Sequence, residues 1–294
     1  MTDINKYRPE PTGDLTLEWL LRELHRISYD LEELHMSGYD FGLEVARGNV
    51  SGMSKVNKFG RAPSGVQTTL TDIWDRADST PTQSVWVAPT TARVHAIVST
   101  STSDDGDPAG VGARTIQVYG LTSWSTAETS EVITLDGTTP VNTSNSYVII
   151  HRMKVLTKGA TNVNVGVITA TAATDGTVTA QINAGEGQTQ MAIYGIPSTK
   201  TAYMRSFYGT VNKSSGTLAT INFCIKVNPE PDAEPINFLT KNTRGVQSTG
   251  TSSGIFEFEP PFTISGPAII KVSAEASSND IEASAGFDLY LEDN

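Results

Sequence analysis

The sequence predicts a mainly β protein with one α-helix near its N-terminus. Two periodicities and one set of punctuating residues predict this fold. Apolar residues recur at steps of three and four between residues 15 and 36, which is typical of an amphipathic helix. From residue 84 onward the apolar residues alternate with polar ones, and Gly, Asn and Asp separate the alternating segments. We therefore expect a coiled-coil-like helix followed by two antiparallel β domains of the sandwich or jelly-roll type.

The helix is predicted from its apolar side chains, which form a seam of a and d heptad positions completed by one e position. Asp14 is a plausible N-cap, and Gly38 is a suitable C-terminal stop. A broad stripe of Leu and Ile favours association of three or more helices. The alternative is an amphipathic helix that folds onto its own domain. The predicted oligomerisation and docking residues are Leu17, Leu20, Leu21, Leu24, Ile27, Leu31 and Leu34.

The chain order predicts four segments. Residues 1–37 form an N-terminal arm and the docking helix, and the glycine-punctuated residues 38–82 form a connector. Residues 83–198 form a first β-sandwich, with hairpin signals such as Asp136-Gly137. Residues 199–294 form a second, jelly-roll-like sandwich, because a turn at Pro197 precedes a new series of strands.

Composition narrows the possible partners. The 294 residues carry a formal net charge of −11, and Lys and Arg are scattered, so we expect no nucleic-acid partner. The sequence begins without a secretory signal, and no apolar run approaches about 18 residues, so we expect synthesis in the cytoplasm and no membrane insertion. The single cysteine, Cys224, cannot form an intramolecular disulfide.

The motifs that could carry chemistry are weak. The run Asp104 to Asp107 holds three carboxylates, but it lacks the alternating acids and later Glu of a calcium loop, so we interpret it as a solvated hairpin tip. His95 and His151 lie in predicted strands, and the four histidines show no zinc-ligand spacing. The sequence contains one Gly-x-Ser-x-Gly match, at residues 250–254, but no histidine lies near it in the sequence. We predict no catalytic residues, no metal and no cofactor.

Trp124 is the one residue that we would test first for contact with a ligand. It lies in a polar loop, 121–130, where a large aromatic ring has an apolar face and a polar edge to offer. The alternative for this ring is packing against the core. A host surface glycan is the ligand class that such an exposed tryptophan would suit.

Several short motifs resemble those of a family of tailed-bacteriophage virion proteins. They are residues 57–61 (NKFGR), 70–75 (LTDIWD), 112–121 (GARTIQVYGL), 135–141 (LDGTTPV), 184–194 (AGEGQTQMAIY) and 196–203 (IPSTKTAY). The resemblance covers about residues 55–210 and consists of turn and strand signatures. It implies a structural component of the virion, such as a fibre, a head or neck appendage or a decoration protein, and such proteins are commonly trimers. The N-terminal helix is outside the matching block.

Three functions follow as hypotheses. The first is a non-enzymatic virion protein, a homotrimeric fibre or head/neck appendage that docks through its N-terminal region to a portal-proximal adaptor or a capsid protein. The second is a carbohydrate-binding, receptor-recognition protein of the particle, or a capsid decoration protein. The third is a polysaccharide depolymerase, which is the weakest because the sequence shows no long β-helical repeat.

Overall fold

The computed structural model describes residues 17–36, 41–78, 83–212, 218–233 and 236–294, with the side chains of residues 18, 30–36, 64 and 78 outside that description. The chain divides into two compact units, residues 1–50 and residues 51–294. The predicted mainly β architecture built from antiparallel sheets is confirmed. No helix in the described ranges is both long enough and apolar enough to cross a membrane.

The described residues of the first unit, 17–36 and 41–50, contain two helices. Helix α1 spans Leu17–Met36, which confirms a helix within the predicted range, and α2 spans Phe41–Ala46 inside the predicted connector. Gly48 follows α2 in the left-handed region, with φ of +77°, and its N–H donates to the carbonyl of Val45. Glycine adopts this conformation without strain, so the α2 helix ends there.

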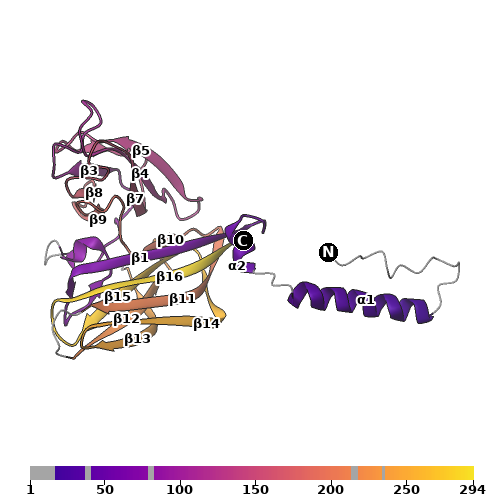
Figure 1. Ribbon diagram of the computed structural model, residues 1–294. Helices are drawn as coiled ribbons and strands as arrows, with labels where there is room; N and C mark the ends of the chain where they lie inside the picture. Colours follow the sequence, from indigo (N-terminus) through magenta and orange to yellow (C-terminus); the bar gives the residue numbers. More distant parts are fainter. Residues whose placement is uncertain (1–16, 37–40, 79–82, 213–217, 234–235) are drawn as a thin grey trace. The chain divides into compact units, whose positions relative to one another are not determined.

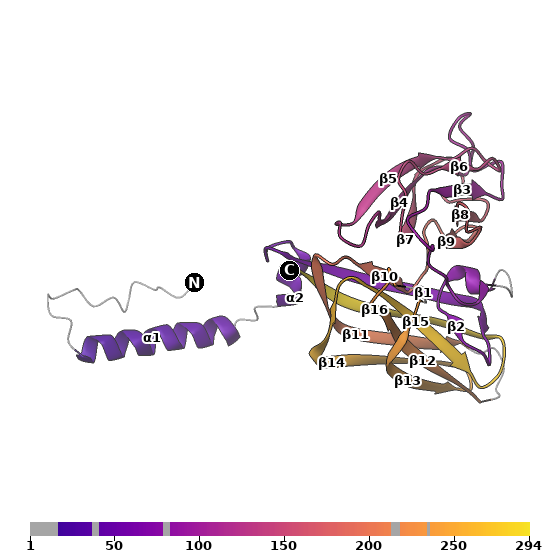
Figure 2. The same cartoon turned by 180° about the vertical axis from the view of Figure 1, so that it is seen from behind.

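Two antiparallel sheets of the second unit share one hydrophobic core (Figures 1 and 2). The first has the order β1-β16-β11-β14, and the second has the order β10-β15-β12-β13 with β2 paired to β15. Phe207 and Phe287 of the first sheet and Phe223 and Val272 of the second share one core. The strands are β1 (Met53–Val66), β2 (Thr71–Asp72), β10 (Ile193–Ile196), β11 (Lys200–Asn212), β12 (Ala219–Asn228), β13 (Leu239–Ser248), β14 (Thr251–Ser265), β15 (Ala268–Ala276) and β16 (Ile281–Asp293).

The residues between β2 and β10 form a second pair of sheets. One has the order β6-β3-β8-β9 and the other β5-β4-β7, and their side chains share a separate core. Ile193 of β10 and Ile269 of β15 also belong to this core, so it is continuous with the sheets that precede and follow it in sequence. The strands are β3 (His95–Ser99), β4 (Ala113–Leu121), β5 (Thr129–Thr134), β6 (Val141–Asn142), β7 (Ile149–Lys158), β8 (Ile168–Ala172) and β9 (Val178–Ile182).

The sheets do not follow the predicted division at residue 198. Strand β1 lies in the segment assigned to a connector, yet it pairs with β16 from Met53↔Glu292 to Val66↔Ile281. Strand β10, assigned to the first domain, pairs with β15. The β3–β9 part is therefore inserted between strands of the C-terminal sheets. The sequence did not predict this insertion because it did not predict β1 as a strand. The inward face of β1 carries Lys58, Gly60 and Ala62, which do not give the apolar alternation of a typical strand.

A buried charged network joins β2 to β15 and to the start of the insertion. The Lys271 Nζ donates to the Asp72 carboxylate at 2.6 Å, and the Ser273 hydroxyl donates to the same group at 2.5 Å. The Trp86 backbone N–H is a third donor, at 2.7 Å. The Lys271 ammonium also lies 4.2 Å from the centre of the Phe238 ring. Asp72 and Lys271 are both buried, and each has the partners that a buried charge requires.

Candidate functional site

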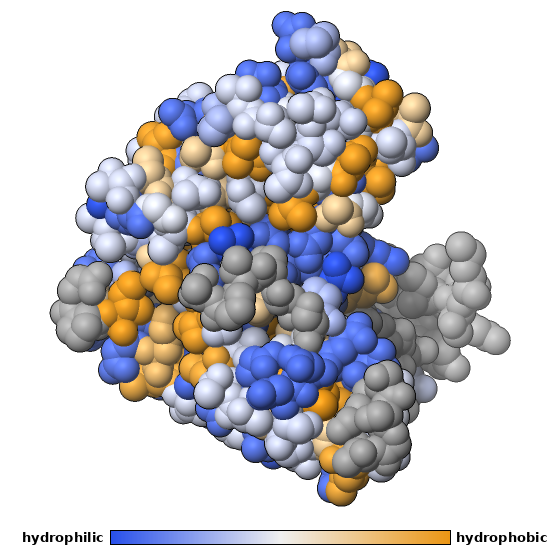
Figure 3. All heavy atoms as spheres, turned by 90° about the vertical axis from the view of Figure 1, so that its left-hand side faces the viewer, coloured by the Kyte–Doolittle hydropathy of each residue, from blue (hydrophilic) through white to orange (hydrophobic). Residues whose placement is uncertain are grey.

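The apolar stripe of α1 is exposed in the single chain. Leu17 keeps 74% of its surface accessible and Leu24 keeps 60%. Leu20, Leu21 and Ile27 are exposed as well, whereas the predicted positions Leu31 and Leu34 have side chains outside the described residues. By contrast, the face of the molecule in Figure 3 shows small apolar areas scattered among polar residues. The assignment of the stripe to assembly or docking stays a prediction.

Trp124 lies between β4 and β5 and is partly buried. Its side chain packs against the core of the inserted sheets, and its ring lies close to Gly195 of β10. Its backbone carbonyl accepts a hydrogen bond from the Ser198 N–H at 2.7 Å. The ring thus has the packing role that the alternative interpretation gave it, and its contact with a ligand stays a prediction.

The interpretation of Asp104 as part of a solvated hairpin tip is wrong. Its side chain is fully buried and accepts hydrogen bonds from the Ser99 hydroxyl and from the backbone N–H groups of Ala113, Val165 and Gly166, at 2.7–2.8 Å. These donors come from three separate segments, so the carboxylate holds loops of the insertion together. Within the described residues, no cluster of acidic, His or Cys side chains could hold a metal ion.

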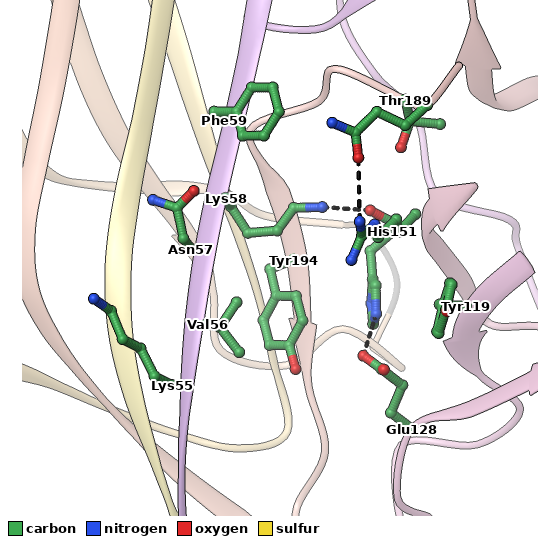
Figure 4. Close-up of a pocket in the computed structure, with 12 residues that line it drawn as sticks. Lys55, Val56, Asn57, Lys58, Phe59, Tyr119, Glu128, His151, Thr189 and Tyr194 are labelled. Carbon is green, nitrogen blue, oxygen red and sulfur yellow. Dashed lines mark hydrogen bonds and ion pairs between the residues drawn. The ribbon is translucent and has the colours of Figure 1, made fainter. Parts of the chain in front are cut away.

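A cleft lies where β1 and β10 meet the inserted sheets. Its volume is about 440 Å³, within the range typical of ligand sites. One wall comes from β1, and the facing wall comes from β4, β7 and the loop before β10 (Figure 4). Charged and polar side chains line much of it, including Lys58, Glu128, His151 and Arg152.

Lys58 is the most unusual residue of this cleft, because it is buried and no carboxylate of the described residues lies at hydrogen-bond distance from it. The residue is 8% exposed, and its Nζ donates to the backbone carbonyl of His151 at 2.5 Å. Burial, and to a smaller extent the nearby Arg152 charge, lower the pKa of Lys58 to about 7, although the Glu128 charge partly opposes both effects. A negatively charged ligand here would favour the protonated amine.

His151 links the cleft to its one acidic side chain. Its Nε2 lies 2.6 Å from the Glu128 carboxylate, and its ring lies 4.5 Å from the Tyr194 ring, centre to centre (Figure 4). Burial lowers the pKa of His151 despite the carboxylate. Since an ionised carboxylate only accepts, we assign the proton to Nε2. This leaves the buried Nδ1 as an acceptor with no hydrogen-bond partner among the described residues.

A second hollow, of about 320 Å³, adjoins the first at Gln188. Lys154 and Lys158 of β7 line it. Arg152 and Lys154 lie on one face of β7, because alternate residues of a strand point the same way. Both cations lie over the Tyr119 ring, at 5.7 and 5.4 Å from its centre. The two hollows therefore form a continuous surface, the β7 groove, in which cationic side chains outnumber carboxylates.

Sequence reasoning placed His151 in a strand, which β7 confirms, but it did not bring the residues of the β7 groove together. They come from positions as far apart as Lys58, Glu128 and Tyr194, and only the pairing of β1 and β10 with distant strands joins them. The alternation of Arg152, Lys154 and Lys158 along β7 was a readable signal of a basic strand face.

Comparison with known proteins adds no further identification. No protein-family model matches the chain, and no curated protein shows significant similarity to it.

Proposed function

We propose that the protein is a non-enzymatic structural component of a bacteriophage particle, and that it assembles as a homotrimer through α1. The family resemblance of residues 55–210 supports the virion assignment. The arm and helix of residues 1–37 would dock to a portal-proximal adaptor or capsid protein, and the β domains would project from the particle. We further infer that the two larger sheets form a sandwich of the jelly-roll type.

The observation that carries the assembly proposal is the exposed stripe of α1. Burying a leucine side chain that is otherwise in water is worth about 1.5–3 kcal/mol. The stripe contains Leu17, Leu20, Leu24 and Ile27 at heptad spacing, and each of them remains exposed in the single chain. An isolated helix of 20 residues is of marginal stability in water. Association of three α1 helices would therefore stabilise each helix as well as bury its apolar stripe.

The first test measures the mass of the full chain in solution by light scattering. We expect a trimer, about three times the 31.4 kDa of one chain. The double variant Leu24→Ala and Ile27→Ala removes two seam side chains, and we expect it to be monomeric at micromolar concentration. Tyr29→Ala is the matched control, because Tyr29 is as exposed as Leu24 but lies at an f position, away from the seam.

A monomeric wild-type chain, or equal loss of association in the Tyr29→Ala control, would overturn assembly through α1. The virion assignment has a separate test. Electron microscopy of purified particles carrying an affinity label on this chain should show the label at the capsid, neck or tail in a fixed copy number. Particles without label would contradict it.

A further inference from the structure

We propose that the β7 groove binds an acidic saccharide, a sugar chain whose carboxylates pair with Lys58, Arg152 and Lys154. The groove comprises the two adjoining hollows, of about 440 and 320 Å³, and every residue in it belongs to the second unit. The proposed site is distinct from Trp124 and does not depend on assembly through α1.

The charges of the groove are the first argument. The Lys58 and Arg152 side chains line the first hollow, and Lys154 and Lys158 line the second, whereas the Lys55 side chain points away from the cleft (Figure 4). The two carboxylates that line them form their hydrogen bonds elsewhere: Glu128 bonds to His151 at 2.6 Å, and Glu186 bonds to Arg61 at 2.7 Å. The Glu128 charge still attracts Lys58 and Arg152, but the cations of the groove outnumber its carboxylates, on a chain whose formal net charge is −11.

The hydrogen-bonding groups are the second argument. The floor of the first hollow contains the buried Nζ of Lys58, which has two N–H groups beyond the one given to the His151 carbonyl. Gln188 and Thr189 add amide and hydroxyl groups beside the cations. Amides and hydroxyls both donate and accept, as a ligand rich in hydroxyl groups requires, while the cations match its carboxylates.

The overall charge separates a saccharide from a nucleic acid. A duplex carries one negative charge per about 1.7 Å, and its binding relies on many phosphate contacts. The net charge of −11 opposes so dense a polyanion, whereas a sugar chain with isolated carboxylates meets only the local cations. The Tyr119 ring, which could otherwise stack on a base, lies beneath Arg152 and Lys154.

Lys58 makes the affinity depend on pH. The groups around it are Arg152, Glu128 and His151 from the insertion, Tyr194 from β10 and Lys55 on its own strand. The pKa of Lys58 is about 7, so the amine gains its charge as the pH falls through neutrality, while a sugar carboxylate stays ionised. Binding should therefore strengthen from about pH 8 to about pH 6, and Lys58→Met should flatten this dependence.

The test is calorimetric or NMR titration of the full chain with trigalacturonate at low salt. The matched ligand control is the methyl ester of the same trisaccharide, which has the same rings without the charges. The double variant Arg152→Gln and Lys154→Gln should weaken binding by at least about tenfold. Lys241→Gln, an exposed lysine on β13, is the matched protein control and should leave the affinity within about twofold of wild type.

Each outcome decides the proposal. Binding of the acid but not of its ester, lost in the double variant and kept in Lys241→Gln, supports it. No binding of trigalacturonate up to about 10 mM overturns it, as does equal binding of the ester. Equal weakening by Lys241→Gln would show only general attraction to positive charge and would overturn the site. Tighter binding of an oligothymidylate through Arg152 and Lys154 would replace the saccharide by a nucleic acid.

Discussion

Two buried lysines, Lys58 and Lys271, lie in different regions of the second unit and have different surroundings. Lys271 is 2% exposed, and its Nζ lies 2.6 Å from the Asp72 carboxylate. The Ser273 hydroxyl and the Trp86 backbone N–H donate hydrogen bonds to the same carboxylate. Lys58 is 8% exposed and bonds a neutral carbonyl, with the Arg152 cation nearby. The first network is complete within the protein, whereas the second is incomplete and borders a cleft.

The difference separates a structural charge from a candidate binding charge. A buried pair that is fully hydrogen-bonded fixes the elements that carry it, here β2 and β15. A buried cation that bonds no carboxylate costs stability, and such cations are found where a ligand can supply a negative charge. Removing the carboxylate partner of Lys271 should therefore destabilise the fold, whereas replacing Lys58 should change the stability little.

The largest effect is expected from Asp72→Asn. This substitution keeps the size of the side chain and leaves the Lys271 charge buried without a carboxylate. We expect the free energy of unfolding to fall by about 3–5 kcal/mol. Urea unfolding followed by tryptophan fluorescence measures it, because Trp86 lies within the network. Adding Lys271→Met should recover part of the loss, and a double variant as unstable as the single one would contradict this reading.

A smaller effect is expected from Lys58→Met. It removes one hydrogen bond, worth about 0.5–1.5 kcal/mol, and also removes a desolvated charge, so the two changes offset each other. We expect a free energy of unfolding within about 1 kcal/mol of wild type at neutral pH. A loss as large as that of Asp72→Asn would mean that Lys58 is a structural residue, and the contrast between the two lysines would disappear.

The pH dependence of the same variant has a defined sign. The pKa of Lys58 is about 7 in the folded chain and about 10.4 when unfolded. Between these values the unfolded state binds more protons, so wild-type stability rises with pH relative to Lys58→Met. The difference should grow by up to about 1.4 kcal/mol per pH unit from about pH 7 to about pH 9. Parallel stability curves for the two proteins would contradict the lowered pKa.

Helix α1 and strand β1 show which parts of the fold can and cannot be predicted from the sequence. Helix α1 was predicted because its apolar spacing is a local property of residues 17–36. Strand β1 was missed because its inward positions include Gly60, where a side-chain carbon would come within 2.4 Å of the Ile73 carbonyl oxygen. Packing against a distant backbone, not hydrophobicity, decides that position. The β7 groove was missed for a related reason, since Lys58 and His151 meet only after non-local strand pairing.

The smallest effect is expected from Glu128→Gln. The Glu128 side chain is 42% exposed, so its loss should change stability by less than about 1 kcal/mol. Its negative charge nevertheless raises the pKa of Lys58, so the substitution should move that pKa below its value of about 7. NMR titration of the lysine side-chain carbon next to Nζ measures this directly. Glu275→Gln, an exposed residue on β15, is the control and should leave the pKa unchanged. An unchanged or raised pKa in Glu128→Gln would mean that Glu128 does not act on Lys58. Lys58 would then lack even the partial compensation that the Glu128 charge provides.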